Sequence, residues 1–268
     1  MVVMCVYTDE QVREICLDGT LLTGMPRGSA LVVHTTGSPY TVEAIAARVE
    51  FLGIDVLDAA VCGGPHDIAD GRLTLFVGGA DDAVARVSPV LRSYGDPVLH
   101  VGPVGSGQRV KLVNNALFAA QIGLLAEAAD LGRQLGINEA TLLKALPYGS
   151  AACHVMGNIA ARGSVSAFTS AVSHFLDKDV AVVKSTVADV GGDLGVLQVV
   201  IDARQTVDSS RVLCRVIPFP NCVSKFCYCN STITAIWWHS SLVTGLRNRS
   251  VTRPLAAQSF SAFASVCQ

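Results

Sequence analysis

The feature that most constrains the fold is a glycine-rich loop that opens into one long helix. The loop reads Gly102-Pro-Val-Gly-Ser-Gly, and no proline follows it as far as Leu135. Apolar residues then recur three and four positions apart, which places them on one helix face: Val110, Val113, Leu117, Ala120, Leu124, Ala128, Leu131 and Leu135. At 1.5 Å per residue such a helix is about 39 Å long, enough to bridge two domains. We expect this apolar stripe to be buried.

Two polar residues stand near the start of the predicted helix. Lys111 and Asn115 are four positions apart, so they lie one above the other among hydrocarbon side chains. A lysine in such surroundings is desolvated, which disfavours its charged form and suits it to proton transfer at neutral pH. In the alternative, Lys111 extends to solvent and Asn115 caps a neighbouring loop. On the helix pattern alone, that alternative is the commoner one.

Composition narrows the class of partner. The chain has 268 residues, of which 50% are hydrophobic, so it is able to bury one large core or two modest ones. A net charge of -2 gives no reason to expect a nucleic-acid partner or an anionic membrane. We find no membrane-length apolar run and no signal peptide, and we expect a cytoplasmic chain with a small-molecule partner.

The first part of the chain alternates short β-branched runs with helical segments, which predicts an α/β sheet with parallel strands. The expected strands are residues 2–7, 30–34, 56–61, 73–77 and 98–101, and the expected helices are 9–17, 41–52 and 82–94. Ser38 followed by Pro39 is a typical start for the second of these helices. The GxGxxG loop that opens most dinucleotide-binding sheets does not occur in this sequence.

One predicted strand ends in a pair of glycines. The stretch reads Asp58-Ala-Ala-Val-Cys-Gly-Gly-Pro, and backbone N–H groups at such a strand end are able to hold a carboxylate. A simple turn is an equally good interpretation. Cys62 is better read as a polar wall residue than as a nucleophile, because no histidine is well placed to activate it.

After the long helix the sequence predicts shorter helices at 138–146, 151–162 and 175–188, so we expect an all-helical second domain. Lys178 and Asp179 lie on the last of them, where such a pair is most often a solvated surface feature. We therefore divide the chain into a sheet domain at 1–104, the long helix with a helical domain at 105–208, and a tail at 209–268.

The tail differs in composition from the rest. All 22 acidic residues lie at or before Asp208, and the tail holds five of the nine cysteines. A zinc site from Cys222, Cys227 and Cys229 lacks a convincing fourth ligand, so we expect no metal. A non-native reading frame is the simplest account of this composition, and we expect the tail not to pack as a native domain.

Several of these stretches together resemble the β-hydroxyacid dehydrogenase family. Asp58-Ala-Ala-Val-Cys-Gly-Gly is similar to its D-A-P-V-S-G-G, and Gly105-Ser-Gly-Gln-Arg-Val-Lys-Leu-Val-Asn-Asn to its G-x-G-x-x-x-K-x-x-x-N. Gly71-Arg-Leu-Thr-Leu-Phe-Val-Gly-Gly, Thr35-Thr-Gly-Ser-Pro and the Lys178-Asp179 pair resemble three further family motifs. The resemblance covers residues 2–205 and departs from the family at Ala60 and Cys62.

The resemblance implies a partial Rossmann-type parallel sheet, a long interdomain helix and an all-α domain, with NAD or NADP between the domains. Lys111 then matches the catalytic acid/base, and Asn115, Cys62, Gly63 and Gly64 match the residues that bind a small 3-hydroxy acid. Thr36 and Lys178 match residues on the cofactor side, and Lys178 closes the site. Hydride would pass from the hydroxyl-bearing carbon to the nicotinamide while Lys111 takes the hydroxyl proton.

Three interpretations of the chain remain open at this point. It is a dehydrogenase by descent, an inactive fragment of a disrupted gene, or a binding module that dimerises through the helical domain. Because no GxGxxG cradle for the pyrophosphate is found, we expect the isolated chain to be inactive. We expect a homo-oligomer formed through the helical domain.

Overall fold

The structure is a computed structural model that describes residues 1–204, 215–216 and 227–228. The chain divides into two compact units, Met1–Asp208 and Ser209–Gln268. In the second unit the described residues are the short antiparallel strands β6 (Arg215–Val216) and β7 (Cys227–Tyr228). The rest of the predicted tail, with the predictions made for it, lies outside the described residues. The first unit holds all the predicted site residues.

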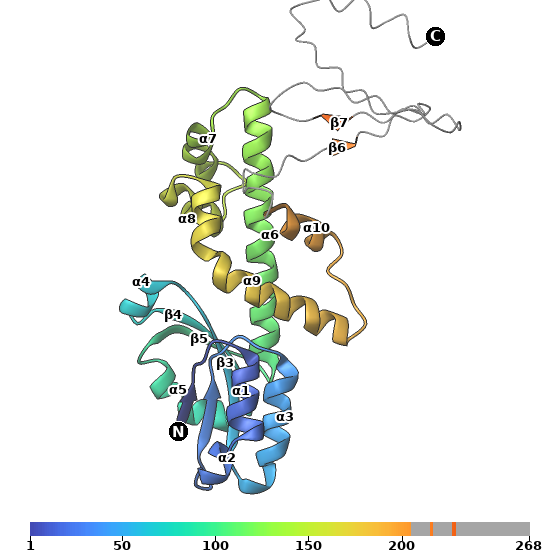
Figure 1. Cartoon of the computed structure of the whole chain (residues 1–268). Coiled ribbons are helices and arrows are strands. Elements are labelled where there is room, and N and C mark those ends of the chain that lie inside the picture. The colour runs from blue at the N-terminus through green and yellow to red at the C-terminus, as the bar shows by residue number, and fades with distance from the viewer. Residues whose placement is uncertain (205–214, 217–226, 229–268) are drawn as a thin grey trace, which may run out of the picture. The chain divides into compact units, whose positions relative to one another are not determined.

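The first unit begins with a five-stranded sheet whose strands follow chain order (Figure 1). The strands are β1 (Val2–Met4), β2 (Ala30–Val33), β3 (Asp55–Cys62), β4 (Leu73–Gly78) and β5 (Gly95–Gly102). The pairs β1–β2, β2–β3 and β4–β5 are parallel. The predicted α/β class with a Rossmann-type, mainly parallel sheet is therefore confirmed.

One strand pair departs from the expected parallel order. β4 runs antiparallel to β3, with Asp58 opposite Gly78 and Cys62 opposite Thr74. The connection between them holds only the short helix α4 (Pro65–Ala69), whereas a parallel crossover needs a dozen or more residues. The short connection therefore turns the chain back on itself.

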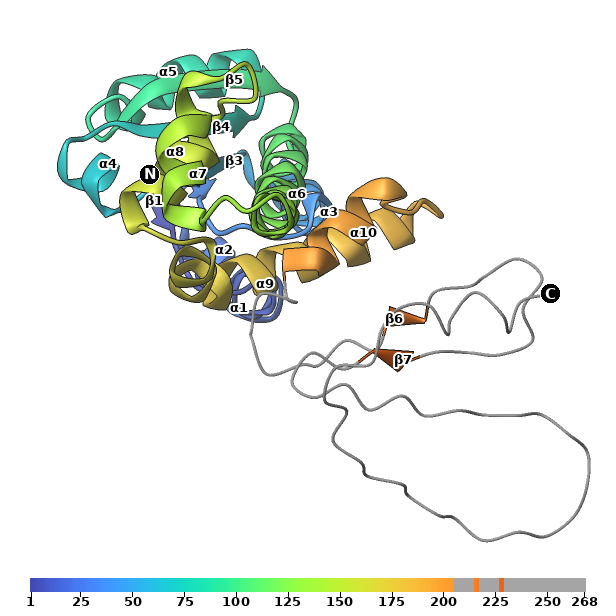
Figure 2. The same cartoon turned by 90° about the horizontal axis from the view of Figure 1, so that it is seen from above.

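Helices cover both faces of the sheet, because the side chains of each strand alternate between the two faces. Leu31 and Val33 pack with α1 (Asp9–Arg13), α2 (Leu21–Gly24) and α3 (Pro39–Val49). Ala30 and Val32 pack with α5 (Asp81–Leu91). Figure 2 shows α5 on one side of the sheet and α1 and α3 on the other. Ser38 caps α3 as expected, its hydroxyl accepting from the N–H of Tyr40.

The long helix α6 (Ser106–Gln134) leaves the sheet and forms the centre of a helical part (Figure 1). Around it lie α7 (Glu139–Ala145), α8 (His154–Arg162), α9 (Val165–Asp189) and α10 (Val196–Ala203). α9 begins ten residues before the predicted helix, since Ser164 caps it and the stretch read as a turn is helical. α10 was not predicted from the sequence.

The predicted burial of the apolar stripe on α6 is wrong for most of its residues. Ala120 is buried, but five residues are about half exposed or more: Val113, Leu117, Leu124, Leu131 and Leu135. The buried face is instead rich in alanine and glycine, including Ala119, Gly123 and Ala126. Small residues let another helix approach closely. A Cβ at Gly123 would lie 1.9 Å from the carbonyl oxygen of Val200 in α10.

Helix α6 is also long and apolar enough, by length and composition, to cross a membrane. In this fold 56% of its most apolar window is buried against protein, and α9, α10 and the sheet pack on it. A core helix in a soluble fold passes the same test.

Candidate functional site

The start of α6 is fixed by a carboxylate buried in the sheet. Asp58, fully buried on β3, accepts hydrogen bonds from the N–H groups of Gly105 and Gln108, both at 2.7 Å. A carboxylate at a helix N-terminus also complements the helix dipole. Burial raises the pKa of the Asp58 carboxyl, and these N–H groups oppose the rise. Asp58 therefore sets where α6 begins relative to β3.

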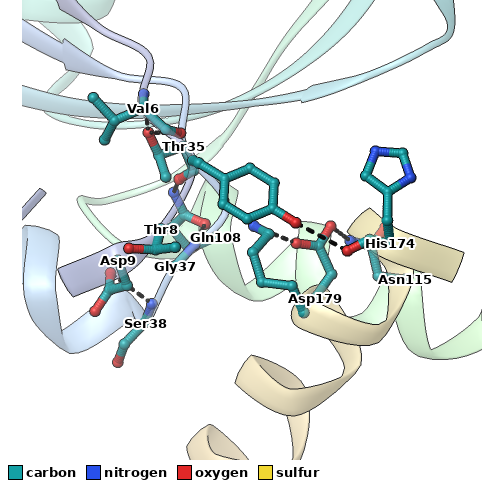
Figure 3. A network of polar contacts seen from close by, with 12 residues as sticks. Val6, Thr8, Asp9, Thr35, Gly37, Ser38, Gln108, Asn115, His174 and Asp179 are labelled. Carbon is teal, nitrogen blue, oxygen red and sulfur yellow. Dashed lines mark hydrogen bonds and ion pairs between the residues drawn. The ribbon is translucent and has the colours of Figure 1, made fainter. Parts of the chain in front are cut away.

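The loop after β2 is tied to α6 by Gln108. Its Oε1 accepts from the N–H of Gly37 at 3.0 Å, and its Nε2 donates to the carbonyl of Thr35 at 2.8 Å. The Thr35 hydroxyl bonds both backbone groups of Val6, which joins the loop after β1 (Figure 3). Thr36, predicted on the cofactor side, is buried between these two anchored residues.

Lys111 and Asn115 lie one turn apart on α6, and both are buried, at 9% and 4% exposure. Within the part of the chain that the structure describes, no ion pair or hydrogen bond joins the Lys111 side chain to another residue. Asn115 donates from Nδ2 to Asp179 on α9 at 2.7 Å. Asn115 thus bonds a neighbouring helix where the alternative had it cap a loop. The role of Lys111 stays a prediction.

The end of β3 meets α6 at the next residue. The Nδ2 of Asn114 lies 3.8 Å from the Sγ of Cys62 and 3.1 Å from the Oδ1 of Asn115. The structure thus places the predicted substrate residues Cys62 and Asn115 on either side of Asn114. Asn114 itself was not predicted from the sequence as a site residue.

One of the two backbone N–H groups in the double glycine after β3 already has a hydrogen-bond partner in the chain. The N–H of Gly64 donates to Asp67 at 2.7 Å, so that group is already engaged. Gly63 has φ +145°, and a Cβ there would meet Leu73 at 2.9 Å, so the turn requires glycine. Binding of a substrate carboxylate by the Gly63 N–H remains a prediction. The Gly64 N–H can bind a carboxylate only after its hydrogen bond to Asp67 is broken.

Lys178 lies across from the sheet loops. Its ammonium is 2.7 Å from the Oδ1 of Asp179 and 5.2 Å from the ring centre of Tyr7, which follows β1. The Tyr7 hydroxyl donates to the carbonyl of His174 on α9 at 2.9 Å (Figure 3). The Lys178–Asp179 pair is therefore mostly buried, unlike the solvated pair that the helix pattern favoured.

Several residues at this site were missed from the sequence. Asp58 and Gln108 stand inside the quoted motifs, and a carboxylate facing a glycine loop is the signal that would have found the cap. No sequence pattern marks Tyr7 as a site residue, because only the fold brings its ring next to Lys178 on α9.

The residues present do not fit the pyrophosphate of a dinucleotide. Phosphates bind at helix N-termini with free N–H groups, but the three helices that begin near the ends of β1 and β2 are capped from within the chain. Thr8 and Gln11 cap α1, Asp9 and Ser38 cap α3, and Asp58 caps α6. Burial raises the pKa of the Asp9 carboxyl, and the Thr41 hydroxyl opposes the rise.

An open pocket of about 600 Å³ lies beside α1 and the residues that follow it. Glu14 and Asp18 line it together with Val6, Gln11, Ile15 and Gly19, and two carboxylates do not favour an anionic ligand. Among the described residues, no group of three or more His, Cys, Asp or Glu side chains is placed to hold a metal ion.

Comparisons with known proteins match both the sheet part and the helical part of the first unit. Residues 1–102 match the sequence model of the NAD binding domain of 6-phosphogluconate dehydrogenase, and residues 105–211 match that for NAD-binding of NADP-dependent 3-hydroxyisobutyrate dehydrogenase. An uncharacterised oxidoreductase of Synechocystis is 32% identical over 69% of this chain and 64% of its own length. Human mitochondrial 3-hydroxyisobutyrate dehydrogenase is 36% identical over 50% of this chain and 40% of its own.

A solved structure shares the fold. The 3-hydroxyisobutyrate dehydrogenase of Mycobacterium tuberculosis superposes with a TM-score of 0.67 at 24% identity, covering 78% of this chain and 74% of that one. The two matched models describe NAD-binding domains, which confirms NAD or NADP as the cofactor of the family. The chain spans less than two thirds of the length of the Synechocystis and human relatives. On its two matched models, its relatives and its fold, the chain belongs to the β-hydroxyacid dehydrogenase family.

Proposed function

We propose that this chain carries the substrate half of an oxidoreductase site for a small 3-hydroxy acid. The observation that carries the proposal is the buried pair Lys111 and Asn115 on α6, with Asn114 beside it in contact with Cys62 at the end of β3. The human relative, 3-hydroxyisobutyrate dehydrogenase, is named for a substrate of this class. That substrate class is our proposal for this chain.

In this proposal each residue has one task. Lys111 binds the substrate hydroxyl and exchanges its proton at Nζ. A buried lysine that has no carboxylate partner among the described residues is suited to this role. Asn115 donates its second Nδ2 hydrogen to the substrate. Cys62 and Gly63 form the wall beside the carboxylate, and Thr36 and Lys178 lie on the cofactor side.

We further propose that the isolated chain has impaired turnover. Its helix N-termini near β1 and β2 are capped by its own side chains, so it supplies the substrate half of the site without a cradle for pyrophosphate. An inactive fragment of a disrupted gene remains the alternative to this proposal.

The test measures binding of 3-hydroxyisobutyrate by ligand-observed NMR. We expect a saturation-transfer signal with the wild-type chain, and we expect its loss in Lys111→Met. Lys144→Met is the matched control, since Lys144 is an exposed lysine on α7. Absence of a signal from the wild-type chain, or an unchanged signal in Lys111→Met, would reject the proposal.

A second candidate function is dimerisation, and one observation favours it. Val113, Leu117, Leu124 and Leu131 expose an apolar stripe along α6, and Leu135 directly after the helix extends it. Leu117, Leu124 and Leu131 are seven residues apart. A leucine repeat of seven is typical of helices that pair. We propose that two copies associate through this stripe.

Light scattering after size-exclusion chromatography distinguishes a dimer from a monomer. We expect a dimer for the wild-type chain and a monomer for the double variant Leu117→Lys, Leu124→Lys. Phe51→Lys is the control, since Phe51 is 76% exposed and is not part of α6. A monomeric wild-type chain would exclude the dimer.

A further inference from the structure

Asp179 lies between two residues that the proposed function uses. It is 6% exposed on α9. Its Oδ2 accepts a hydrogen bond from the Nδ2 of Asn115 at 2.7 Å, and its Oδ1 forms an ion pair with the Nζ of Lys178 at 2.7 Å. Oδ1 accepts no hydrogen bond within the described residues, and the polar group that it contacts there is the Lys178 ammonium. One buried carboxylate thus joins the substrate side to the cofactor side.

The carboxylate decides which way the Asn115 amide points. An ionised carboxylate only accepts hydrogen bonds, so the NH₂ end of Asn115 must face Asp179. The amide oxygen then faces the other way, where it accepts from Asn114 at 3.1 Å. This arrangement leaves one Nδ2 hydrogen of Asn115 for a ligand oxygen. A neutral amide at position 179 would accept either orientation of Asn115.

Lys178 is held from a second direction. The Tyr7 ring lies 5.2 Å from its ammonium, and the Tyr7 hydroxyl is fixed by its bond to the His174 carbonyl (Figure 3). An ammonium over an aromatic face is attracted by the ring. The ammonium is therefore confined between Asp179 and a ring from the sheet part, and its side chain is 21% exposed.

We propose that Asp179 is a positioning residue of this site. It fixes the orientation of the Asn115 amide and the place of the Lys178 ammonium, and Tyr7 supports the second of these tasks. The inference rests on the proposed function for the roles of Asn115 and Lys178. The arrangement itself is measurable in the chain as it exists, with no need for turnover.

The first experiment measures the acetylation rate of each lysine by peptide mass spectrometry. In Asp179→Asn, we expect Lys178 to react about threefold faster or more, because its ion pair is lost. Lys184, on the same helix, serves as internal reference. Asp189→Asn is the matched control, an exposed carboxylate on α9, and should leave Lys178 unchanged. An unchanged rate in Asp179→Asn overturns the inference.

A second readout follows the Asn115 side-chain amide by NMR. Its proton that points to Asp179 should lie downfield in the wild-type chain and shift upfield in Asp179→Asn, while Asp189→Asn leaves it in place. A general loss of structure would instead move many amide signals together. No shift at Asn115 would contradict the proposed orientation of its amide.

Tyr7 provides a test that does not depend on a buried substitution, since Tyr7 is 53% exposed. Tyr7→Ala removes the ring and should raise the acetylation rate of Lys178. Tyr7→Phe keeps the ring and should raise it less. Tyr148→Ala, which alters a tyrosine that is 92% exposed, is the control. Equal rates in all three variants and the wild-type chain would overturn the role given to Tyr7.

Binding of 3-hydroxyisobutyrate separates this inference from the proposed function. We expect Asp179→Asn to weaken that binding about tenfold, as loss of a charged hydrogen-bond partner does, and Asp189→Asn to leave it unchanged. If the wild-type chain binds no hydroxy acid, the proposed function fails, and the acetylation and NMR results still decide the arrangement around Asp179. Normal binding by Asp179→Asn would overturn its positioning role.

Discussion

His34 is a buried titratable residue directly after β2. Its ring is 6% exposed, its Nδ1–H donates to the Ala59 carbonyl at 2.5 Å, and its Nε2 accepts from the Tyr94 hydroxyl at 2.9 Å. Burial lowers the pKa of the imidazole, and the Ala59 carbonyl opposes the shift. The folded chain therefore favours the neutral ring more than the unfolded chain does.

The sign of the pH dependence follows from that direction. A lowered pKa contributes stability that is present above the unfolded value of 6.5 and is lost as pH falls through the folded pKa. We expect the free energy of unfolding of the wild-type chain to fall between pH 7 and pH 5 more steeply than that of His34→Gln. Urea denaturation across this range measures it. His66→Gln, at an exposed histidine on α4, should keep the wild-type profile, and parallel profiles for all three would contradict this role of His34.

Asp58 offers a second test at the residue scale. In Asp58→Asn one amide oxygen remains as an acceptor, while the new NH₂ faces an N–H of Gly105 or Gln108. We expect a loss of about 1–3 kcal/mol in the free energy of unfolding, since a buried donor is left unsatisfied. Asp70→Asn, at an exposed ion pair with Arg72, should change it by less than about 0.5 kcal/mol. Equal stabilities of the two variants would refute the capping role.

Sequence reasoning reached some of these residues and not others, for a physical reason. Lys111 and Asn115 were found because a helix period fixes their mutual position, and Ser38 because capping is local. Tyr7 was not found, and Asp179 was noted without its bond to Asn115. Their contacts join segments 167 and 64 residues apart, in the bonds Tyr7–His174 and Asn115–Asp179. Local patterns carry no information about such contacts.

At the scale of elements, helix α6 was predicted correctly from the sequence, but the face of it that is buried was predicted wrongly. Its apolar period predicts the helix, but a face of alanine and glycine packs more closely than one of leucine. Gly123 against Val200 is the closest such approach. Which face meets the core therefore depended on α10, which the sequence did not predict.

The close contact between Gly123 and Val200 can be tested by comparing two glycine-to-alanine substitutions, one at this contact and one at an open position. In Gly123→Ala the new Cβ would lie 1.9 Å from the Val200 carbonyl oxygen, so α10 must move away and the free energy of unfolding should fall by about 2 kcal/mol or more. In Gly157→Ala, on α8, the new methyl meets nothing within 4 Å, and stability should rise by about 0.5–1 kcal/mol. Thermal unfolding followed by circular dichroism measures both. A stabilising Gly123→Ala would show that α10 does not pack on α6 as described.

At the scale of the whole molecule, the order of strands and helices was predictable and the direction of β4 was not. β-branched runs separated by helices indicate an α/β sheet, and the five predicted strands are all present. The antiparallel β3–β4 pair follows from a short connection around α4, a helix that the sequence did not reveal.

The same whole-molecule arrangement leads to a prediction about the cofactor. α1, α3 and α6 all begin near the ends of β1 and β2, and each has its N-terminus capped by a side chain of this chain. At the N-termini of α3 and α6 a pyrophosphate would have to displace Asp9 or Asp58, and the pocket beside α1 is lined by Glu14 and Asp18. Each of these routes places two anions together without a free helix N-terminus to hold the phosphates.

We therefore expect the isolated chain to bind neither NAD nor NADP more tightly than about 1 mM, a free energy of binding near about -4 kcal/mol. Calorimetric titration with each dinucleotide measures this directly. Human 3-hydroxyisobutyrate dehydrogenase, titrated in the same buffer, is the positive control. Binding in the micromolar range by this chain would show that Thr36, Lys178 and the loops after β1 and β2 hold a dinucleotide without a pyrophosphate cradle, and it would favour an active dehydrogenase over an impaired one.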